Sequence, residues 1–82
     1  MPDASTRMRL LAVINDVFRR RLTEQEFSRA RRVDELVDVD SLTLINFVMG
    51  VEEAFGIDLI AEEHDREFFM DIDRLERRLD AR

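Results

Sequence analysis

The chain of 82 residues contains no cysteine and no lysine, and it has only two glycines and one proline. Without cysteine, disulfide bonds and thiolate metal sites are excluded, so apolar helix faces must hold the fold together. No apolar run approaches the roughly 18 residues that a membrane-spanning helix requires. The N-terminus lacks the cationic and apolar segments of a signal peptide. We therefore expect a cytoplasmic protein with no membrane span.

Charge is distributed unevenly along the chain. Residues 1–32 carry a net charge of +4, residues 33–73 a net charge of −12, and residues 74–82 a net charge of +2. The acidic centre should repel nucleic acid and attract basic protein surfaces. The arginine clusters at 19–21 and at positions 29, 31 and 32 can either pair with this acidic face or form a second docking surface. We favour pairing.

The apolar pattern predicts one all-α domain over residues 1–82, with its core at about 6–80. A first amphipathic helix should run from Ser5 or Thr6 to about Arg21, because apolar residues recur at spacings of three and four. Its apolar face comprises Met8, Leu10, Leu11, Ile14, Val17 and Phe18. Residues 22–37 are loosely patterned, and we expect a long loop there, with a helical turn near residues 24–30.

A second helix is expected between Asp40, a good N-cap, and Gly56, a good residue to follow a C-terminus. A short extended connector at 57–60 and a short helix at about 61–67 should follow. Asp71 then suits the N-cap of a last helix with Ile72 on its apolar face. The predicted fold is thus a small helical bundle of three main helices and one short helix.

The pair Asp40-Ser41 stands where loop sequence gives way to this strongly apolar second helix. By itself such a pair is most simply a helix cap. However, a serine at the first or second helical position can point to solvent, and the helix dipole there favours an attached anion. Ser41 is therefore a candidate for carrying a phosphate ester.

The segment Val37-Asp38-Val39-Asp40-Ser41-Leu42, followed by an apolar run ending in Glu52-Glu53-Ala54-Phe55, resembles the acyl carrier proteins. Their second helix starts with Leu-Gly-x-Asp-Ser-Leu and closes in Glu-Glu-x-Phe. The segment Phe69-x-Asp71-Ile72-x-x-Leu75 is similar to the start of their last helix. The resemblance covers roughly residues 6–80. Asp38 departs from it, since it replaces the usual glycine.

The resemblance implies a monomeric carrier rather than an enzyme. Ser41, flanked by Asp40 and Leu42, would hold 4′-phosphopantetheine, which a separate phosphopantetheinyl transferase takes from coenzyme A. The thiol of that arm would carry an acyl group in a fatty-acid, lipid or polyketide pathway. A serine hydroxyl needs an adjacent base to act as a nucleophile, and the single histidine, His64, lies far along the chain, where we expect a solvated or packing role.

Acyl-loading and acyl-processing enzymes with basic docking surfaces are the other implied partners. The acidic residues expected to face them lie before and along the second helix and in the connector. They are Asp38, Glu52, Glu53, Asp58, Glu62 and Glu63. The alternative function is an unmodified acidic helical adaptor that binds basic protein surfaces.

Two further features concern packing. Gly50 lies in the middle of the second helix, where we favour close helix packing over room for an acyl chain near Phe47, Met49 and Leu59. In Phe68-Phe69-Met70, one or two side chains should be core, and a remaining exposed aromatic could contact a partner or a lipid chain.

Overall fold

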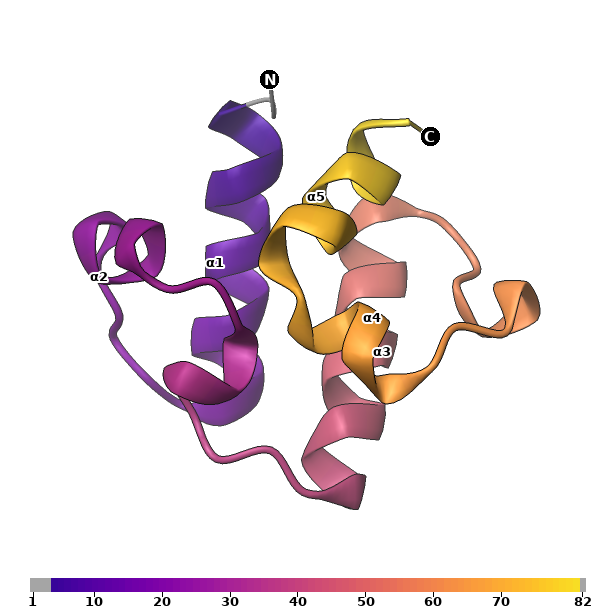
Figure 1. Ribbon diagram of the computed structural model, residues 1–82, viewed down its shortest axis with the longest axis horizontal. Coiled ribbons are helices and arrows are strands. Elements are labelled where there is room, and N and C mark those ends of the chain that lie inside the picture. The colour runs from indigo at the N-terminus through magenta and orange to yellow at the C-terminus, as the bar shows by residue number, and fades with distance from the viewer. Residues whose placement is uncertain (1–3, 82) are drawn as a thin grey trace.

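Two long antiparallel helices, α1 (Ala4–Phe18) and α3 (Ser41–Phe55), form the centre of the molecule (Figure 1). The third main helix, α5 (Ile72–Asp80), packs against α1. The computed structural model describes residues 4–81, and this part of the chain contains no β-strand. The shorter elements are α2 (Glu24–Arg29), η1 (Val33–Glu35), η2 (Ile60–Glu62) and α4 (Arg66–Met70). The predicted all-α class with three main helices is confirmed.

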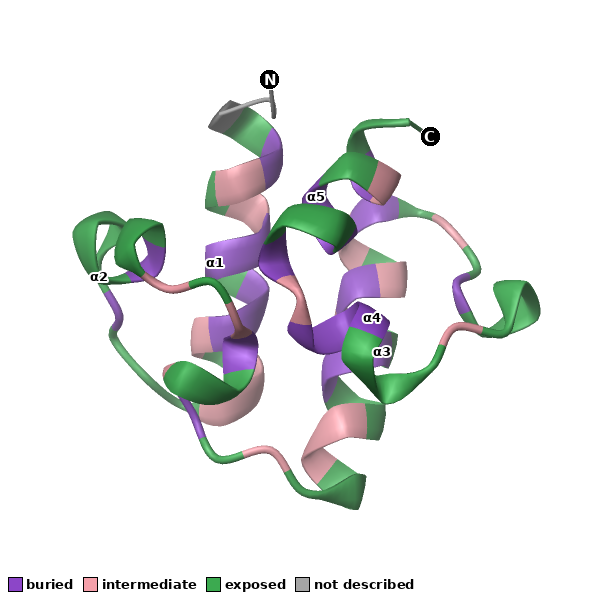
Figure 2. Cartoon of the chain, viewed as in Figure 1, coloured by how far each residue is buried: buried purple, intermediate pink, exposed green. Residues whose placement is uncertain are grey.

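The core receives apolar side chains from all five α-helices, which turn their buried faces towards the middle of the domain (Figure 2). Fully buried positions include Leu10 and Ile14 of α1, Phe47 and Val51 of α3, and Leu75 of α5. Met8, predicted to lie on the buried face of the first helix, is instead 56% exposed. The buried face of α1 is formed around Leu10, Val13 and Ile14. The apolar spacing thus predicted the helix correctly but placed Met8 on its buried face by mistake.

Helix α1 ends at Phe18, three residues before the predicted end at Arg21. Arg19 takes a positive φ of 55°, and the N–H of Arg20 donates to the carbonyl of Asn15 at 3.0 Å. This is the Schellman ending, which usually has glycine at the left-handed position. The side chain of Asn15 then fixes the exit, because it accepts from the N–H of Leu22 and donates to the Leu22 carbonyl. Arg19–Arg21 therefore form a turn rather than the last turn of the helix.

The segment at 22–37 is more ordered than the predicted long loop. Helix α2 coincides with the expected turn, and it starts at a capping box between Thr23 and Glu26. The 3₁₀ turn η1 follows, with Val33 fully buried. The apolar residues Leu22, Phe27, Val33 and Val37 of this segment are buried, and Leu36 is half-buried.

Close packing explains Gly50. A Cβ atom there would lie 3.1 Å from Cγ1 of Val13 and 3.1 Å from Cγ2 of Val17, both on α1. The favoured interpretation, that Gly50 lets two helices approach, therefore agrees with the structure. Gly56 has a different role, because it ends α3 at a φ of +64° with nothing within 4 Å of a built Cβ.

The prediction of one short helix at about 61–67 is wrong in its bounds. The segment is divided into η2 and α4, because Glu63 adopts a φ of 56° and Asp65 caps a new helix by accepting from the N–H of Phe68. Helix α4 then carries Phe68, Phe69 and Met70, and all three are buried. The expectation that one of these aromatics remains exposed is therefore also wrong. Asp71 caps α5 as predicted, by accepting from the N–H of Arg74.

Candidate functional site

Ser41 is the first residue of α3, and it is exposed. Asp40 is the N-cap: its carboxylate accepts from the N–H of Thr43 at 2.8 Å, and its own N–H donates to Oγ1 of Thr43 at 2.9 Å. These bonds to Thr43 hold the pKa of the Asp40 carboxyl below its usual range. The Asp40 carboxylate is thus used to start the helix. The Ser41 hydroxyl stands in the field of the helix N-terminus, which stabilises an attached anion.

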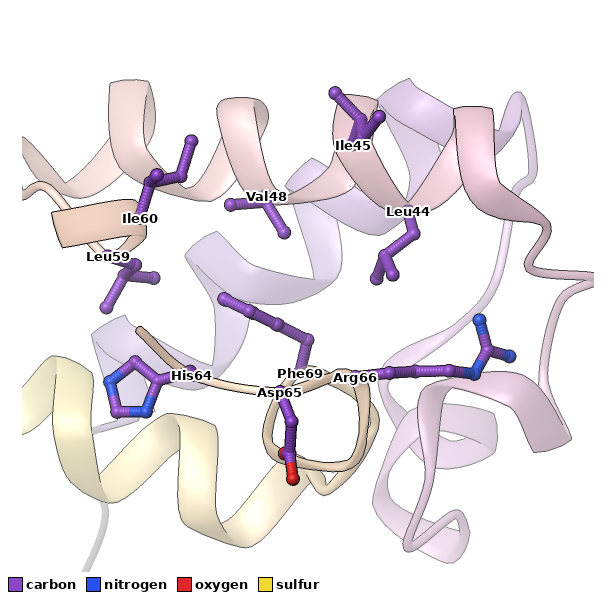
Figure 3. Close-up of a pocket in the computed structure, with 9 residues that line it drawn as sticks. All are labelled: Leu44, Ile45, Val48, Leu59, Ile60, His64, Asp65, Arg66 and Phe69. Atoms are coloured by element: carbon purple, nitrogen blue, oxygen red, sulfur yellow. The ribbon is translucent and has the colours of Figure 1, made fainter. Parts of the chain in front are cut away.

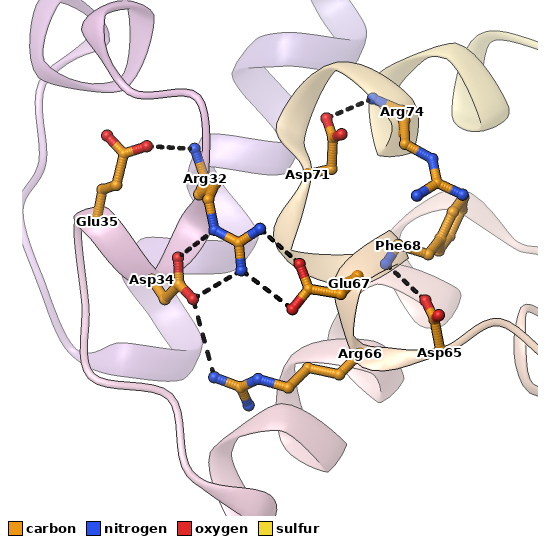
Figure 4. A network of polar contacts seen from close by, with 9 residues as sticks. All are labelled: Arg32, Asp34, Glu35, Asp65, Arg66, Glu67, Phe68, Asp71 and Arg74. Carbon is orange, nitrogen blue, oxygen red and sulfur yellow. Dashed lines mark hydrogen bonds and ion pairs between the residues drawn. The ribbon is translucent and has the colours of Figure 1, made fainter.

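The loop that leads to Ser41 is held from the opposite side by α4. A guanidinium nitrogen of Arg66 donates to the carbonyl of Val39 at 3.2 Å and lies 3.9 Å from a carboxylate oxygen of Asp34. Arg32 links the same two elements, because it pairs with Asp34 of η1 and with Glu67 of α4 (Figure 4). These pairs are exposed, so each contributes little alone. Together they fix where α3 begins relative to α4.

An apolar cavity of about 220 Å³ opens along the face of α3 that begins one turn after Ser41. Leu44, Ile45 and Val48 line it from α3, and they lie three, four and seven residues after Ser41. At this spacing all four side chains share one face of the helix. Across the cavity lie Leu59 and Phe69 (Figure 3). Ser41 does not line the cavity itself, but it lies on the helix face that leads to it.

Polar side chains mark the two ends of this cavity. Arg66 reaches from the cavity towards the loop before Ser41, and His64 lies near the other end, beside Leu59 (Figure 3). The His64 ring stacks on Phe68 with centroids 3.6 Å apart, and its Nε2 lies 2.7 Å from Glu62. These contacts give His64 a packing role, in agreement with the prediction, and direct it away from Ser41.

The outward face of α3 carries an exposed apolar stripe that overlaps the cavity at Ile45. Leu42 is 67% exposed, Ile45 55% and Met49 56%, and they follow each other at spacings of three and four. Ile60 of η2 is also exposed. This stripe starts directly beside Ser41, so a partner that reaches the hydroxyl will also meet apolar surface.

The six acidic residues predicted to face partners do not form one free surface. Glu52 folds back and accepts from the N–H groups of Leu59 and Ile60 at 2.8 and 3.1 Å. Asp58 accepts from the N–H of Ala61. Glu62 pairs with Arg78 and His64, and the Arg78 guanidinium lowers the pKa of the Glu62 carboxyl to about 2.

The other three, which are Asp38, Glu53 and Glu63, are exposed and have no ion pair within residues 4–81. Three of the six carboxylates are therefore used inside the fold, to cap turns or to join η2 to α5. The same described residues contain no group of three side chains suited to hold a metal ion.

The arginines divide in the same way. In the two arginine clusters, at 19–21 and at positions 29, 31 and 32, Arg32 alone pairs with carboxylates within the described residues. The favoured interpretation, pairing with acidic residues, therefore applies to one of these six arginines. The other five are exposed, and among them the Arg20 guanidinium donates to the Leu36 carbonyl at 3.1 Å. They are Arg19, Arg20, Arg21, Arg29 and Arg31.

Comparison of the chain with protein-family models, with curated proteins and with solved structures gives no match. Within residues 4–81, no helix combines the length and the hydrophobicity needed to cross a bilayer. The site therefore has to be interpreted from its own geometry.

The sequence predicted Ser41, Asp40 and Leu42 as site residues, and these stay predictions. Of the residues it offered for an acyl-chain space, Leu59 lines the cavity, whereas Phe47 and Met49 do not. It did not single out Arg66. Leu44 and Val48 could have been found, because they follow Ser41 at helical spacing. Arg66 gave no such signal, because its contact with Val39 depends on how α4 packs.

Proposed function

We propose that this chain is a carrier protein of the acyl carrier type, which holds an acyl group as a thioester on 4′-phosphopantetheine attached to Ser41. The observation that carries the proposal is an exposed serine at the first position of a long helix, on the same helix face as an apolar cavity that begins one turn later. A serine that is only a cap or a surface residue has no need of such a cavity. The motif around Asp40-Ser41-Leu42 supports the same conclusion.

The attachment step needs a second protein. The hydroxyl oxygen of Ser41 attacks the phosphorus of coenzyme A that bears pantetheine, a phosphodiester forms, and 3′,5′-ADP leaves. A separate phosphopantetheinyl transferase must accept the hydroxyl proton, because His64 is directed towards Phe68 and Glu62 rather than towards Ser41. The new phosphodiester carries a negative charge, which the N-terminus of α3 stabilises. The domain itself therefore presents its cargo and does not catalyse a reaction on it.

The cavity supports an acyl cargo. Its lining is mostly apolar, from α3, from Leu59 and Ile60, and from α4, beside the polar residues His64, Asp65 and Arg66. A chain tethered at Ser41 would enter it from the first turn of α3. Gly50 contributes nothing to this cavity, since it faces α1. Enzymes that load and process the acyl group are the further partners under this proposal, and the exposed stripe at Leu42, Ile45 and Met49 adds an apolar contact to the expected charged ones.

Intact mass spectrometry tests the proposal directly. The protein is incubated with coenzyme A, Mg²⁺ and a broad-specificity phosphopantetheinyl transferase. We expect a gain of one 4′-phosphopantetheine group on the wild type and no gain on Ser41→Ala. Ser28→Ala, which changes an exposed serine of α2, is the matched control and should be modified fully. If the wild type gains no mass while an authentic acyl carrier protein does, the proposal fails and an unmodified helical adaptor becomes the better interpretation.

A further inference from the structure

The turn of Arg19, Arg20 and Arg21, called the basic turn below, presents three exposed cations, of which Arg20 also donates to the Leu36 carbonyl at 3.1 Å. Within residues 4–81 none of its three guanidinium groups pairs with a carboxylate, whereas Arg7, Arg32, Arg66 and Arg78 all do. The turn is nevertheless fixed in shape, because Asn15 bonds to Leu22 from both ends of its amide. A rigid, exposed cluster of three cations has the properties of a docking surface.

The backbone at Arg19 makes the arrangement more unusual. Its φ of 55° belongs to the left-handed region, which glycine occupies at little cost and arginine does not. Glycine is found at the equivalent place after α3, where Gly56 has a φ of 64°. The chain therefore keeps a cation at a position where glycine would stabilise the fold. Backbone strain of this kind is concentrated at functional positions.

The basic turn lies at the same end of the molecule as Ser41. In Figure 1 the C-terminal end of α1 and the N-terminal end of α3 lie at one end of the domain, and a surface groove of about 300 Å³ joins them. Arg19 and Arg20 line this groove together with Asp38 and Thr43. A standard protein interface covers roughly 800 Å² of each partner. That is about a seventh of the 5347 Å² surface of this chain, so an enzyme centred on Ser41 will also cover the groove.

We infer that the basic turn is a second docking surface, which binds an acidic patch on the phosphopantetheinyl transferase that modifies Ser41. The inference rests on the proposed function, and the transferase is the one partner which that function requires. Three arginines are too few for an anionic membrane or a nucleic acid, which engage larger basic surfaces. The net charge of −12 over residues 33–73, with Asp38 in the groove itself, opposes both of these ligands further. A protein can instead match a cationic turn and a neighbouring carboxylate at once.

The test measures kcat/KM for modification by the transferase of the source organism, with coenzyme A, at low and at high salt. We expect Arg19→Gly to raise the melting temperature by about 4 °C, because it relieves the left-handed arginine. The same variant should lower kcat/KM about twofold, as loss of one interfacial charge does. Structural damage cannot explain a variant that is more stable and yet modified more slowly.

The variant Arg19→Gly/Arg20→Gln/Arg21→Gln should lower kcat/KM about five- to tenfold at low salt, and the difference should shrink as salt screens the contact. The matched control Arg29→Gln/Arg31→Gln/Arg77→Gln removes three exposed cations elsewhere and should be modified at close to the wild-type rate. Modification of the basic-turn variant at or above the wild-type rate would overturn the inference. The inference would also be overturned if the wild type bound vesicles containing phosphatidylserine through the basic turn while the basic-turn substitutions left modification unchanged. Failure of the wild type to gain mass with any transferase would instead remove the proposed function.

Discussion

An alanine at either glycine of this protein should lower its stability, but for two different physical reasons. At Gly50 an alanine gains about 0.5–1 kcal/mol of helix stability but introduces a methyl group 3.1 Å from side-chain carbons of Val13 and Val17. Overpacking of this kind costs about 1–3 kcal/mol. We therefore expect Gly50→Ala to lower the free energy of unfolding by about 1 kcal/mol, the difference between these two effects. In a domain of this size, that corresponds to a fall in Tm of about 4–8 °C.

At Gly56 the limit is the backbone. Nothing lies within 4 Å of a built Cβ, but the φ of +64° is one that alanine adopts only at a cost of about 1 kcal/mol. Gly56→Ala should therefore destabilise the protein by a similar amount for an unrelated reason. Adding Val17→Ala, which removes one of the crowding methyl groups, distinguishes the two cases. It should recover at least 0.5 kcal/mol of the Gly50→Ala loss, and it should leave the Gly56→Ala loss unchanged.

Urea unfolding of the three single variants, including Val17→Ala alone, and of the two double variants, followed by far-UV circular dichroism, measures these values. A Gly50→Ala variant that is more stable than the wild type would refute the packing argument, because it would show that α1 withdraws without cost. Under the proposed function, the loss at Gly50 should also be equal with and without a bound acyl group, since the cavity beside Val48 lies away from the contact with Val13 and Val17. A loss confined to the loaded form would mean that the chain reaches Gly50 after all.

Two predictions concern pH. Glu76 of α5 is fully buried beside a partly exposed Arg7, and burial raises the pKa of its carboxyl, so its ionised form costs stability as pH rises above about 4.5. Glu76→Gln should raise the free energy of unfolding at pH 7 by about 1 kcal/mol. The control Glu24→Gln, at an exposed position, should leave it unchanged. A Glu76→Gln protein that is less stable than the wild type would mean that the ion pair with Arg7 outweighs the cost of burial. Glu62 affects stability in the opposite direction. Because Arg78 lowers the pKa of the Glu62 carboxyl to about 2, the ionised carboxylate stabilises the fold above pH 4.5, and this stabilisation is lost as pH falls towards 2. Glu62→Gln should therefore flatten acid unfolding over that range, measured as the urea midpoint against pH, and an unchanged slope would show that the pair with Arg78 is not maintained in solution.

The sequence predicted α3 and the start of α5 well because their boundaries are set locally. Asp40, Gly56 and Asp71 each act on backbone groups within a few residues, so their chemistry can be read without the fold. The end of α1 was predicted wrongly because apolar spacing does not show where a helix stops, whereas the bonds between Asn15 and Leu22 end the helix earlier. Glu63 divides the predicted short helix by a left-handed turn of the same kind. Glutamate is not typical of this conformation, so the sequence did not indicate the turn.

In the candidate site, too, features set by local sequence could be predicted, and features set by distant contacts could not. Ser41 and its cap were accessible from the sequence, since they depend on one helix terminus. The cavity was not, because it exists only where α3, η2 and α4 meet, and their relative positions depend on distant contacts such as those of Arg66 with Val39 and Asp34. The acidic residues were overestimated as a surface for a related reason. Whether a carboxylate caps a turn, as Glu52 does, is decided by which N–H groups the chain brings to it.

The distribution of left-handed residues connects stability with the proposed function. In the described part of the chain, Arg19 and Glu63 are the two non-glycine residues with positive φ. Arg19 lines the groove next to the loop before Ser41, and Glu63 directly precedes His64, which lines the cavity. Where the same backbone conformation serves only to end a helix, at position 56, the chain has glycine. Strain is thus accepted at the two edges of the site and avoided elsewhere, which is the pattern expected if those edges are kept for contact with other molecules rather than for folding.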